Sequence, residues 1–388
     1  MKICYVLPRY DKNSAENFFH IIHFLEELGK KVELYIIIEH GDSSKIVRSA
    51  KQTFVLNYQD NASSHFLRTL KIVKIYFDLY KKGVNIFFAR ASLTGVLPLI
   101  LANRILNFNR SRVIFWSCGI DVIPLSYFPN KKNIKRLLSK GLIRFAFIGI
   151  NYLATGPEKM ANYYHQFFNI PKNKIVTLYN DISLNRFYPL PSLEKLSLKK
   201  ELLNSQKIVL LFVHTFNRSR GADLLPLIAI ELKNKNIDAV IVAIGRPGDY
   251  SSELDLQIEN NQLQNHLINL GQIPNRKIEN FYQISDLFLM PSRGEGFPRV
   301  MLEAMACKSP PISFDVGGVS EIMSHTMQNE LLIPLNESDK FIDQVIKIIQ
   351  NEVLLNQLAN YSYEKVKEYS TENIVEMYVN ALSRIHEK

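Results

Sequence analysis

The chain has 388 residues, of which 47% are hydrophobic and 22% are charged, so it can form two or three folded domains and is neither disordered nor fibrous. Its three cysteines, Cys4, Cys118 and Cys307, are far apart and odd in number, which excludes a disulfide framework and favours a reducing compartment. The net charge of +10 is concentrated in residues 1–190, with 27 Lys and Arg against 12 Asp and Glu, whereas residues 191–388 hold 20 against 25.

We expect no segment that directs secretion or crosses a membrane. The first residues hold one Lys and a short apolar run before Pro8, without the features of a signal peptide. The most apolar long stretch, Val84 to Leu106, is interrupted by Arg90, Pro98 and Arg104, so it lacks the roughly 20 apolar residues of a spanning helix. The sequence therefore predicts a soluble, cytoplasmic protein.

Short apolar runs alternate with stretches of helical spacing, and this pattern occurs twice along the chain. The runs are continuous rather than alternating, which predicts strands buried on both faces of parallel sheets. In the first half the predicted strands are Lys2–Leu7, Lys31–Glu39, Thr53–Asn57, Val84–Ala89, Arg112–Trp116, Tyr152–Thr155 and Ile175–Leu178, and the main helices are Ala15–Leu28, Phe66–Lys82 and Asn133–Phe147. In the second half the predicted strands are Lys207–Val213, Ala239–Ile244, Leu267–Leu270, Asp286–Met290, Pro311–Phe314 and Leu331–Ile333.

Two prolines near the middle of the chain, Pro189 and Pro191, mark a linker. We therefore predict an α/β protein with two Rossmann-like domains, residues 1–188 and residues 189–369. A last helix, Glu372 to His386, follows residues that can cap it, and residues 370–388 are a candidate to cross back and pack on the first domain. Because ligands bind beyond the carboxyl ends of strands in such sheets, we expect the active site in a cleft between the two facing domains.

The segment after the predicted strand Asp286–Met290 carries the strongest signal. It contains a glycine-rich turn and then a helix that starts near Pro298, where proline suits the first turn. The N–H groups of Phe297, Arg299 and Val300 would point out of the helix end and form an anion site.

Two glutamates, Glu295 and Glu303, flank this helix end. Such carboxylates can bind hydroxyl groups on either side of a diphosphate, which matches the sugar and the ribose of a nucleotide-sugar. The alternative is an ordinary capped helix with Glu303 in solvent, and that alternative holds for most pairs of glutamates at this spacing. The signal is therefore the whole string Pro291–Ala306 and not the two glutamates alone.

The string Pro291–Ala306 resembles the donor-site signature of the retaining GT-B glycosyltransferases of family four, the glycosyl transferases group 1. Residues 178–189, 212–225, 270–274, 307–311 and 315–322 resemble further blocks of that family, so the resemblance covers nearly the whole second half and is weaker in the first. It implies that Glu295 contacts hydroxyls of the donor sugar, that Glu303 contacts the ribose and that Ile273 lies where the base is received. The residues around the helix end that it places at the donor are Gly296, Phe297, Pro298, Arg299 and Val300.

The segment after the predicted strand Lys207–Val213 is expected to hold the diphosphate. The family usually has an Arg at this strand end and a Lys before the next glycine, whereas this chain has His214-Thr215 and Arg220. Guanidinium groups at Arg220 and Arg218 would stabilise the charge on the leaving diphosphate. The alternative is an exposed loop with two solvated arginines. Gly245, after another strand, lets the backbone approach a ligand, or simply makes a turn.

Acceptor-side residues are predicted after strands of the first half. Asn13 and Ser14 stand where the family often has a glycine pair, and either residue alone could be a helix cap. Residues Cys118, Gly119 and Asp121 resemble a His-Gly-x-Asp element, with Cys in place of the His that contacts the donor sugar in relatives. Asp121 is a candidate catalytic residue on the acceptor side, or a turn-forming Asp.

Two helical stretches of the first half are strongly basic. The first carries Lys71, Lys74, Asp78, Lys81 and Lys82 on one face, and the second carries Lys132, Arg136, Lys140 and Arg144 at i, i+4 spacing. The apolar faces of both helices fit the core of their own domain. Their basic faces fit an anionic membrane that presents a lipid-linked acceptor.

We therefore expect a retaining enzyme that moves a hexosyl-type sugar from a nucleoside-diphosphate sugar to an acceptor hydroxyl, with a lipid-linked saccharide of a cell-surface glycan as the acceptor. No Asp-x-Asp or His cluster is placed for a metal, so we expect no metal and no other cofactor. The alternatives are a non-hydrolysing sugar-nucleotide epimerase, a phosphorylase, or a basic membrane- or nucleic-acid-binding protein with a decayed donor site. No nucleic-acid-binding motif is visible, and we expect no nucleic-acid partner.

Overall fold

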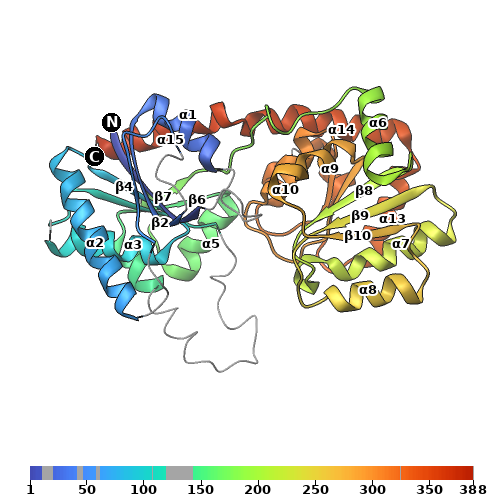
Figure 1. The fold of residues 1–388 in the computed structure, drawn as a ribbon, viewed down its shortest axis with the longest axis horizontal. Coiled ribbons are helices and arrows are strands. Elements are labelled where there is room, and N and C mark those ends of the chain that lie inside the picture. The colour runs from blue at the N-terminus through green and yellow to red at the C-terminus, as the bar shows by residue number, and fades with distance from the viewer. Residues whose placement is uncertain are drawn as a thin grey trace. The chain divides into compact units, whose positions relative to one another are not determined.

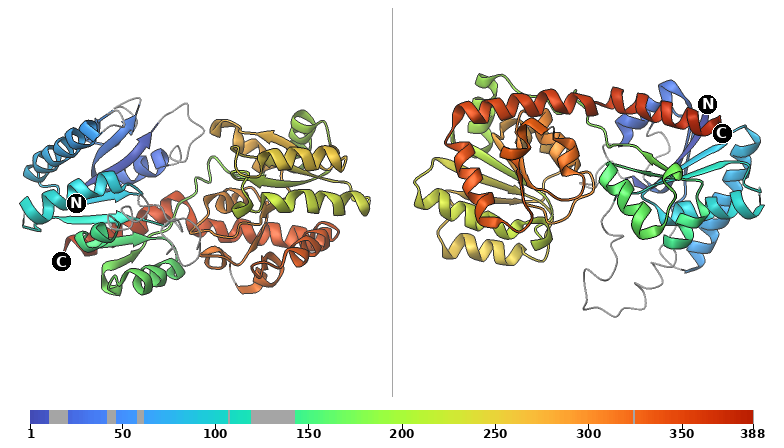
Figure 2. Two further views of the ribbon diagram at one scale, coloured as in Figure 1. Left: turned by 90° about the horizontal axis from the view of Figure 1, so that it is seen from below. Right: turned by 180° about the vertical axis from the view of Figure 1, so that it is seen from behind.

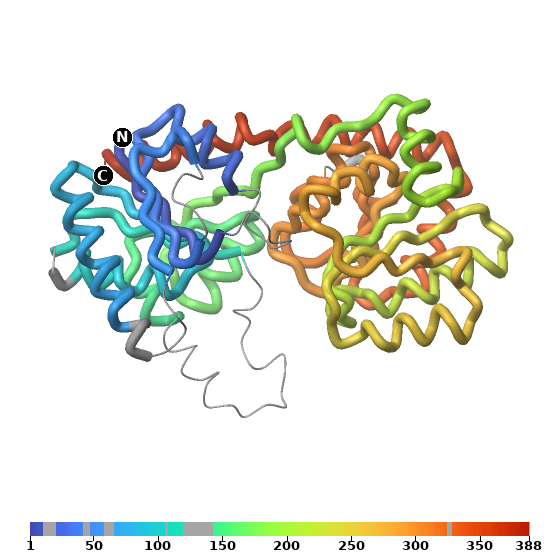
Figure 3. The backbone as a smooth tube through the Cα atoms, viewed as in Figure 1, coloured from blue at the N-terminus to red at the C-terminus, as the bar shows by residue number. Residues whose placement is uncertain are grey.

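The computed structural model describes residues 1–10, 21–41, 47–57, 62–106, 108–118, 143–323 and 325–387 (Figure 3). The chain forms two compact units, one of Met1–Tyr179 with Thr371–Lys388 and one of Asn180–Ser370 (Figure 1). Within the described part of the chain, no helix combines the length and apolarity needed to cross a bilayer.

The division between the units falls at Tyr179, before the predicted boundary at residue 188. The reason is local bonding, because the N–H of Ile182 donates to the carbonyl of Tyr369 at 2.9 Å and Ile182 forms a β-bridge with Ser370. Phe187 also packs on Tyr282, with ring centroids 5.6 Å apart. The two prolines that suggested the linker therefore lie inside the second unit.

The first unit contains a seven-stranded sheet in the order β3-β2-β1-β4-β5-β6-β7, and every pair of neighbouring strands is parallel. Its strands are β1 (Lys2–Tyr10), β2 (Glu33–Gly41), β3 (Gln52–Val55), β4 (Ile86–Arg90), β5 (Arg112–Trp116), β6 (Tyr152–Thr155) and β7 (Ile175–Thr177). Its helices are α1 (Ile21–Lys31), α2 (Ala62–Lys81), α3 (Leu93–Ile100), the π-helical η1 (Leu101–Leu106), residues 143–149, α5 (Glu158–Phe168), the short η4 (Lys172–Lys174) and α15 (Thr371–His386).

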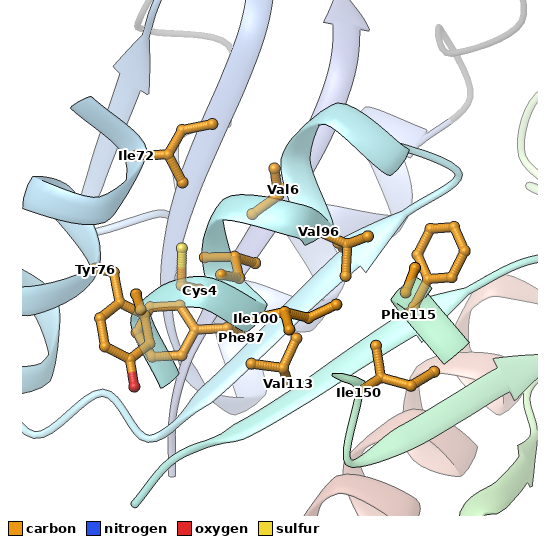
Figure 4. Close-up of a cluster of buried hydrophobic side chains, with 14 of the residues drawn as sticks. Cys4, Val6, Ile72, Tyr76, Phe87, Val96, Ile100, Val113, Phe115 and Ile150 are labelled. Carbon is orange, nitrogen blue, oxygen red and sulfur yellow. The ribbon is translucent and has the colours of Figure 1, made fainter. Parts of the chain in front are cut away.

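The helices of the first unit form two layers, one on each face of its sheet (Figure 1). Cys4 and Val6 of β1 face a core that α2, α3, η1, residues 143–149 and α5 complete (Figure 4). Tyr5, between them in β1, stacks on Phe88 on the opposite face, where α1 and α15 pack. Both termini of the chain belong to this unit (Figure 2).

The second unit contains a six-stranded parallel sheet in the order β10-β9-β8-β11-β12-β13. Its strands are β8 (Ile208–Val213), β9 (Ala239–Ile244), β10 (Leu267–Gly271), β11 (Leu287–Met290), β12 (Pro311–Phe314) and β13 (Leu332–Ile333). Its helices are α6 (Ser192–Leu203), α7 (Leu225–Asn234), α8 (Ser251–Asn260), α9 (Ile278–Ile284), α10 (Arg299–Ala306), α11 (Val319–Ile322), α12 (His325–Leu331), α13 (Ser338–Ile349) and α14 (Glu352–Val366), with short 3₁₀ turns at η5 (Arg218–Arg220), η6 (Ala222–Leu224), η7 (Asn275–Lys277) and η8 (Lys367–Tyr369).

The predicted fold class is confirmed, because each predicted strand overlaps an observed one and both sheets are parallel. The strands β4, β9, β11 and β12 are buried along their whole length, as continuous apolar runs between two helical layers require. The predicted helix 15–28 is described only from residue 21 onward, and the predicted helix 133–147 only from residue 143 onward.

Candidate active site

The candidate site of the second unit lies where its strand order reverses. From β8 the sheet continues through β9 to β10 on one side and through β11 to β13 on the other. In doubly wound sheets ligands bind at such a switch point, beyond the carboxyl ends of the two central strands. The segments that follow β8 and β11 contain His214, Arg220 and Glu295, and the structure brings these three side chains together.

Glycines allow these segments to approach one another closely. Gly221 has a φ of +76°, and a Cβ atom on it would lie 2.1 Å from the carbonyl oxygen of Pro291. A Cβ atom on Gly245 would lie 1.7 Å from the carbonyl oxygen of His214. The backbones after β8, β9 and β11 therefore touch in a way that no side chain would permit.

The Glu295 carboxylate is the centre of the site. Its Oε1 atom accepts hydrogen bonds from Nη1 of Arg220 and from Oγ of Ser292, both at 2.7 Å, and Nε2 of His214 lies 3.5 Å away. Among the described residues, Oε1 thus receives every side-chain hydrogen bond to this carboxylate, and Oε2 receives none.

The ionised form of Glu295 is stabilised although the side chain is only 8% exposed. Burial by itself raises the pKa of this carboxyl, but the hydrogen bond from His214 and the charge of Arg220 outweigh it, and the pKa lies below its ordinary value. Glu295 is therefore a fixed negative charge at neutral pH, suited to accept hydrogen bonds and not to donate a proton.

His214 is held in one tautomer. The N–H of Thr215 donates to Nδ1 of His214 at 2.8 Å, so the ring proton of the neutral imidazole lies on Nε2, the atom that faces Glu295. The family usually has an Arg at this strand end. In this chain the imidazole stands there, with Nε2 3.5 Å from Oε1 of Glu295.

The two predicted phosphate-binding arginines occupy different places. Arg220 also donates to the carbonyl of Gly294 at 2.7 Å, which fixes it within the site. The guanidinium of Arg218 lies over the ring of Tyr250, with Cζ 4.7 Å from the centroid. The structure therefore does not bring Arg218 to Glu295, because an aromatic face outside the loop holds its charge.

Arg293 is a functional candidate that the sequence analysis missed. Its guanidinium makes a bidentate pair with Asp223 at 2.8 and 2.9 Å and donates to the carbonyl of Arg218, and its own N–H donates to the carbonyl of Ser219 at 2.9 Å. These bonds fasten the loop that carries Arg220 to the loop that carries Glu295. Arg293 is thus a positioning residue.

Replacing Arg293 with alanine is expected to lower kcat/KM for transfer by about 10- to 100-fold, because a bidentate charged pair contributes roughly 1.5–3 kcal/mol. The loss should appear mainly in the KM for the donor. Arg293→Lys should recover only part of it, since an ammonium cannot pair bidentately. Steady-state kinetics with varied donor concentration check this, and a wild-type KM in Arg293→Ala would contradict it.

The helix α10 begins at Arg299, with Pro298 as the N-cap and no side chain that caps it. The first turn of an α-helix presents N–H groups that have no acceptor within the helix, so the start of α10 is a position suited to an anion. The Arg299 guanidinium donates to the carbonyl of Asp181 at 2.7 Å. Phe297 packs edge-on against Tyr369, with ring centroids 5.5 Å apart.

Three further predicted donor residues, Gly296, Glu303 and Ile273, lie in different segments of the second unit. The carbonyl of Gly296 accepts from Gly318 at 3.0 Å, which fixes the turn before the helix. Glu303 is half-buried on α10 beside the Tyr282 hydroxyl, and burial followed by the Glu303 charge raises the pKa of that tyrosine well above its ordinary value. Ile273 is half-buried just after β10.

Most of the predicted acceptor residues lie outside the described part of the chain. These residues are Asn13, Ser14, Gly119 and Asp121, and the basic residues Lys132, Arg136 and Lys140 also fall there. Cys118 is described, and it lies after β5, partly buried against the core of the first unit. In the described ranges, no group of three or more His, Cys, Asp or Glu is placed to hold a metal ion.

Comparison with known proteins agrees with this fold. The chain superposes on Anabaena HepE, solved in complex with UDP and glucose, with a TM-score of 0.77, 16% identity, and coverage of 99% of this chain and 100% of that one. The architecture is therefore the GT-B fold.

Sequence comparison gives a family match within the second unit. Residues 194–365 match the family described as Glycosyl transferases group 1. It is 25% identical to N-acetyl-alpha-D-glucosaminyl L-malate synthase of Bacillus anthracis over 300 residues, which cover 77% of this chain and 74% of that protein. It is 32% identical over 97 residues to TuaC of Bacillus subtilis, a glycosyltransferase named for teichuronic acid biosynthesis, and this match covers 25% of this chain and 24% of that protein.

Proposed function

We propose that this protein is a group 1 glycosyltransferase that takes its sugar from a nucleoside-diphosphate sugar and transfers it with retention of anomeric configuration. The donor assignment depends on the carboxylate of Glu295, whose Oε1 atom accepts hydrogen bonds from Arg220 and Ser292. Its Oε2 atom, which accepts no hydrogen bond from the described residues, suits a sugar hydroxyl, and Arg220 with the N-terminal end of α10 suits a diphosphate. The complex of HepE with UDP and glucose supports a uridine diphosphate donor.

In the proposed reaction the bond between the anomeric carbon and the diphosphate breaks while the acceptor oxygen bonds to the same face of that carbon. The acceptor proton passes to an oxygen of the leaving phosphate. Negative charge grows on the diphosphate as it leaves, and Arg220 and the first-turn N–H groups of α10 stabilise that charge. Because protein groups supply this stabilisation, we expect transfer to proceed in the presence of a metal chelator.

A thermal-shift screen of UDP-, GDP- and ADP-sugars tests the donor assignment. We expect at least one of them to raise the melting temperature, because saturation at about 100 times Kd stabilises the folded state by about 2.7 kcal/mol. Arg220→Ala should lose the shift, whereas Arg384→Ala, an exposed arginine of α15 in the first unit, should keep it. Absence of any shift, or conversion of the donor to an epimer without acceptor, would contradict the proposal.

We further propose that the acceptor is a lipid-linked saccharide of a cell-surface glycan, used by a protein that lies on the cytoplasmic face of the membrane. The excess of basic residues in the first 190 positions supports an anionic surface as a partner. The match to TuaC supports a role in cell-surface polysaccharide synthesis.

A further inference from the structure

One helical layer of the first unit carries exposed apolar side chains, and the other does not. The layer made by α2, α3, η1, residues 143–149 and α5, with the turn after η1, holds every large hydrophobic side chain of the first unit that is exposed in the described residues. These side chains are Phe66, Leu67, Leu70, Leu101, Phe108, Phe145, Ile148 and Phe167. The helices α1 and α15 on the opposite face of the sheet expose none.

These exposed side chains are not part of the core. In α2, for example, Ile72, Tyr76 and Leu79 face the sheet and are buried, whereas Phe66 and Leu70 are 65% and 50% exposed (Figure 4 shows Ile72 and Tyr76). Single exposed apolar residues are common, but their collection on one layer marks an interaction surface.

The same layer is also the basic one. Apart from Arg68, which is buried and pairs with Glu39 of β2, its helices hold six Lys and Arg against two Asp and Glu, whereas α1 and α15 together hold three against four. Lys71 and Lys74 continue the exposed face of α2 directly after Leu70. On the opposite layer, Lys30 of α1 pairs with Glu27 at 2.6 Å and Lys31 pairs with Glu376 of α15 at 2.7 Å.

We propose that this layer, the α2–α5 face, is the surface by which the protein lies on an anionic lipid bilayer. Exposed Phe, Leu and Ile beside Lys and Arg fit the boundary between acyl chains and anionic headgroups. A surface for nucleic acid would be basic but would not need exposed aliphatic side chains. The inference rests on the proposed function in one respect, since a lipid-linked acceptor gives the bilayer its role.

Co-sedimentation of the full chain with vesicles tests the proposal. We expect binding to vesicles of phosphatidylcholine with phosphatidylglycerol, weaker binding at high salt, and little binding to pure phosphatidylcholine. Lys71→Gln with Lys74→Gln should weaken the partition constant by about 30-fold, which is about fivefold for each lysine. The matched pair Lys30→Gln with Lys31→Gln, an equal charge change on the opposite layer, should leave it near the wild-type value.

The apolar part of the proposal needs its own variant. Phe66→Ser, Leu67→Ser and Leu70→Ser together should weaken binding to anionic vesicles by more than about tenfold, with an unchanged melting temperature because all three side chains are exposed. Wild-type binding by this variant, equal losses in the two lysine pairs, tighter binding to single-stranded RNA than to anionic vesicles, or no sedimentation at low salt would each overturn the proposal. The thermal shift with nucleotide-sugars is measured on the wild type and on the same variants. If the wild type shows no shift, the proposed function is refuted, whereas binding to vesicles still decides the membrane proposal.

Discussion

Glu295→Gln is expected to lower kcat/KM for sugar transfer by about 10²–10³-fold, the loss typical when one preorganised polar contact to a transition state is removed. Glutamine keeps the shape of the side chain but removes its charge. The amide oxygen can take the Oε1 position and still accept from Arg220 and Ser292, but it carries no charge to pair with Arg220. The amide N–H₂ group would then stand at the Oε2 position, where it cannot accept a hydrogen bond from a sugar hydroxyl.

The control for this variant is Glu330→Gln, which removes the charge of another glutamate that binds a lysine and an amide, Lys347 at 2.9 Å and Gln344 at 2.6 Å. Steady-state kinetics should show near wild-type transfer for Glu330→Gln. The double variant Glu295→Gln with Arg220→Ala should be less impaired than the sum of the two single effects, because the two side chains are in contact. A wild-type rate for Glu295→Gln would refute the assignment of this carboxylate to the donor.

Asp286→Ala is expected to destabilise the second unit by about 3–5 kcal/mol, the usual cost of removing one partner of a buried ion pair. Asp286 pairs with Lys195 at 2.8 Å and with Lys199 at 2.5 Å, and it accepts from the N–H of Val209 at 2.8 Å. It thereby joins α6 to the start of β8 and β11. Without it, the nearly buried Lys199 would have no counter-charge at this position.

The measurement is urea unfolding of the wild type, Asp286→Ala and Asp238→Ala. Asp238 makes a similar pair with Lys207 at 3.7 Å but is 82% exposed, so its loss should change stability by less than about 1 kcal/mol. Equal effects of the two variants would contradict the prediction.

The contribution of Asp286 also has a defined pH dependence. Burial raises the pKa of Asp286, but the charges of Lys195 and Lys199 outweigh burial, so the pKa lies below its ordinary value. The carboxylate therefore stabilises the folded state fully above the ordinary aspartate pKa of about 3.9, and this stabilisation is lost as the pH falls through the folded-state pKa. The stability difference between the wild type and Asp286→Ala should shrink in that acidic range.

The sequence was sufficient for the strands and for the centre of the site. Continuous apolar runs such as Ala239–Ile244 determine strands that must be covered on both faces, and parallel strands then bring the residues after β8 and β11 to one edge. This is why Arg220 and Glu295, 75 residues apart, could be predicted to meet.

What the sequence could not supply was the direction of individual side chains and the choice of partners. Arg218 and Arg299 stand in a phosphate-binding pattern, yet Tyr250 and Asp181 hold their guanidinium groups. Arg293 lies within the segment Pro291–Ala306 that resembles the donor-site signature. Its partner Asp223 is 70 residues away, and nothing in the sequence around either residue indicates that they pair. The division at Tyr179 differs from the predicted boundary at residue 188 for the same reason, because prolines indicate a turn and not which unit the neighbouring backbone bonds to.

The helix α15 completes the first unit although the chain reaches it only after the whole second unit. Tyr378 of this helix packs on Phe24 and Phe88 and lies within 3.5 Å of Arg90, so the first sheet depends on it. A single cut between the units therefore yields no intact N-terminal fragment. Chimaeras that exchange acceptor specificity between relatives must therefore transfer residues 371–387 together with the N-terminal part. A stop codon that removes only this last helix should destabilise the unit formed by the N-terminal residues.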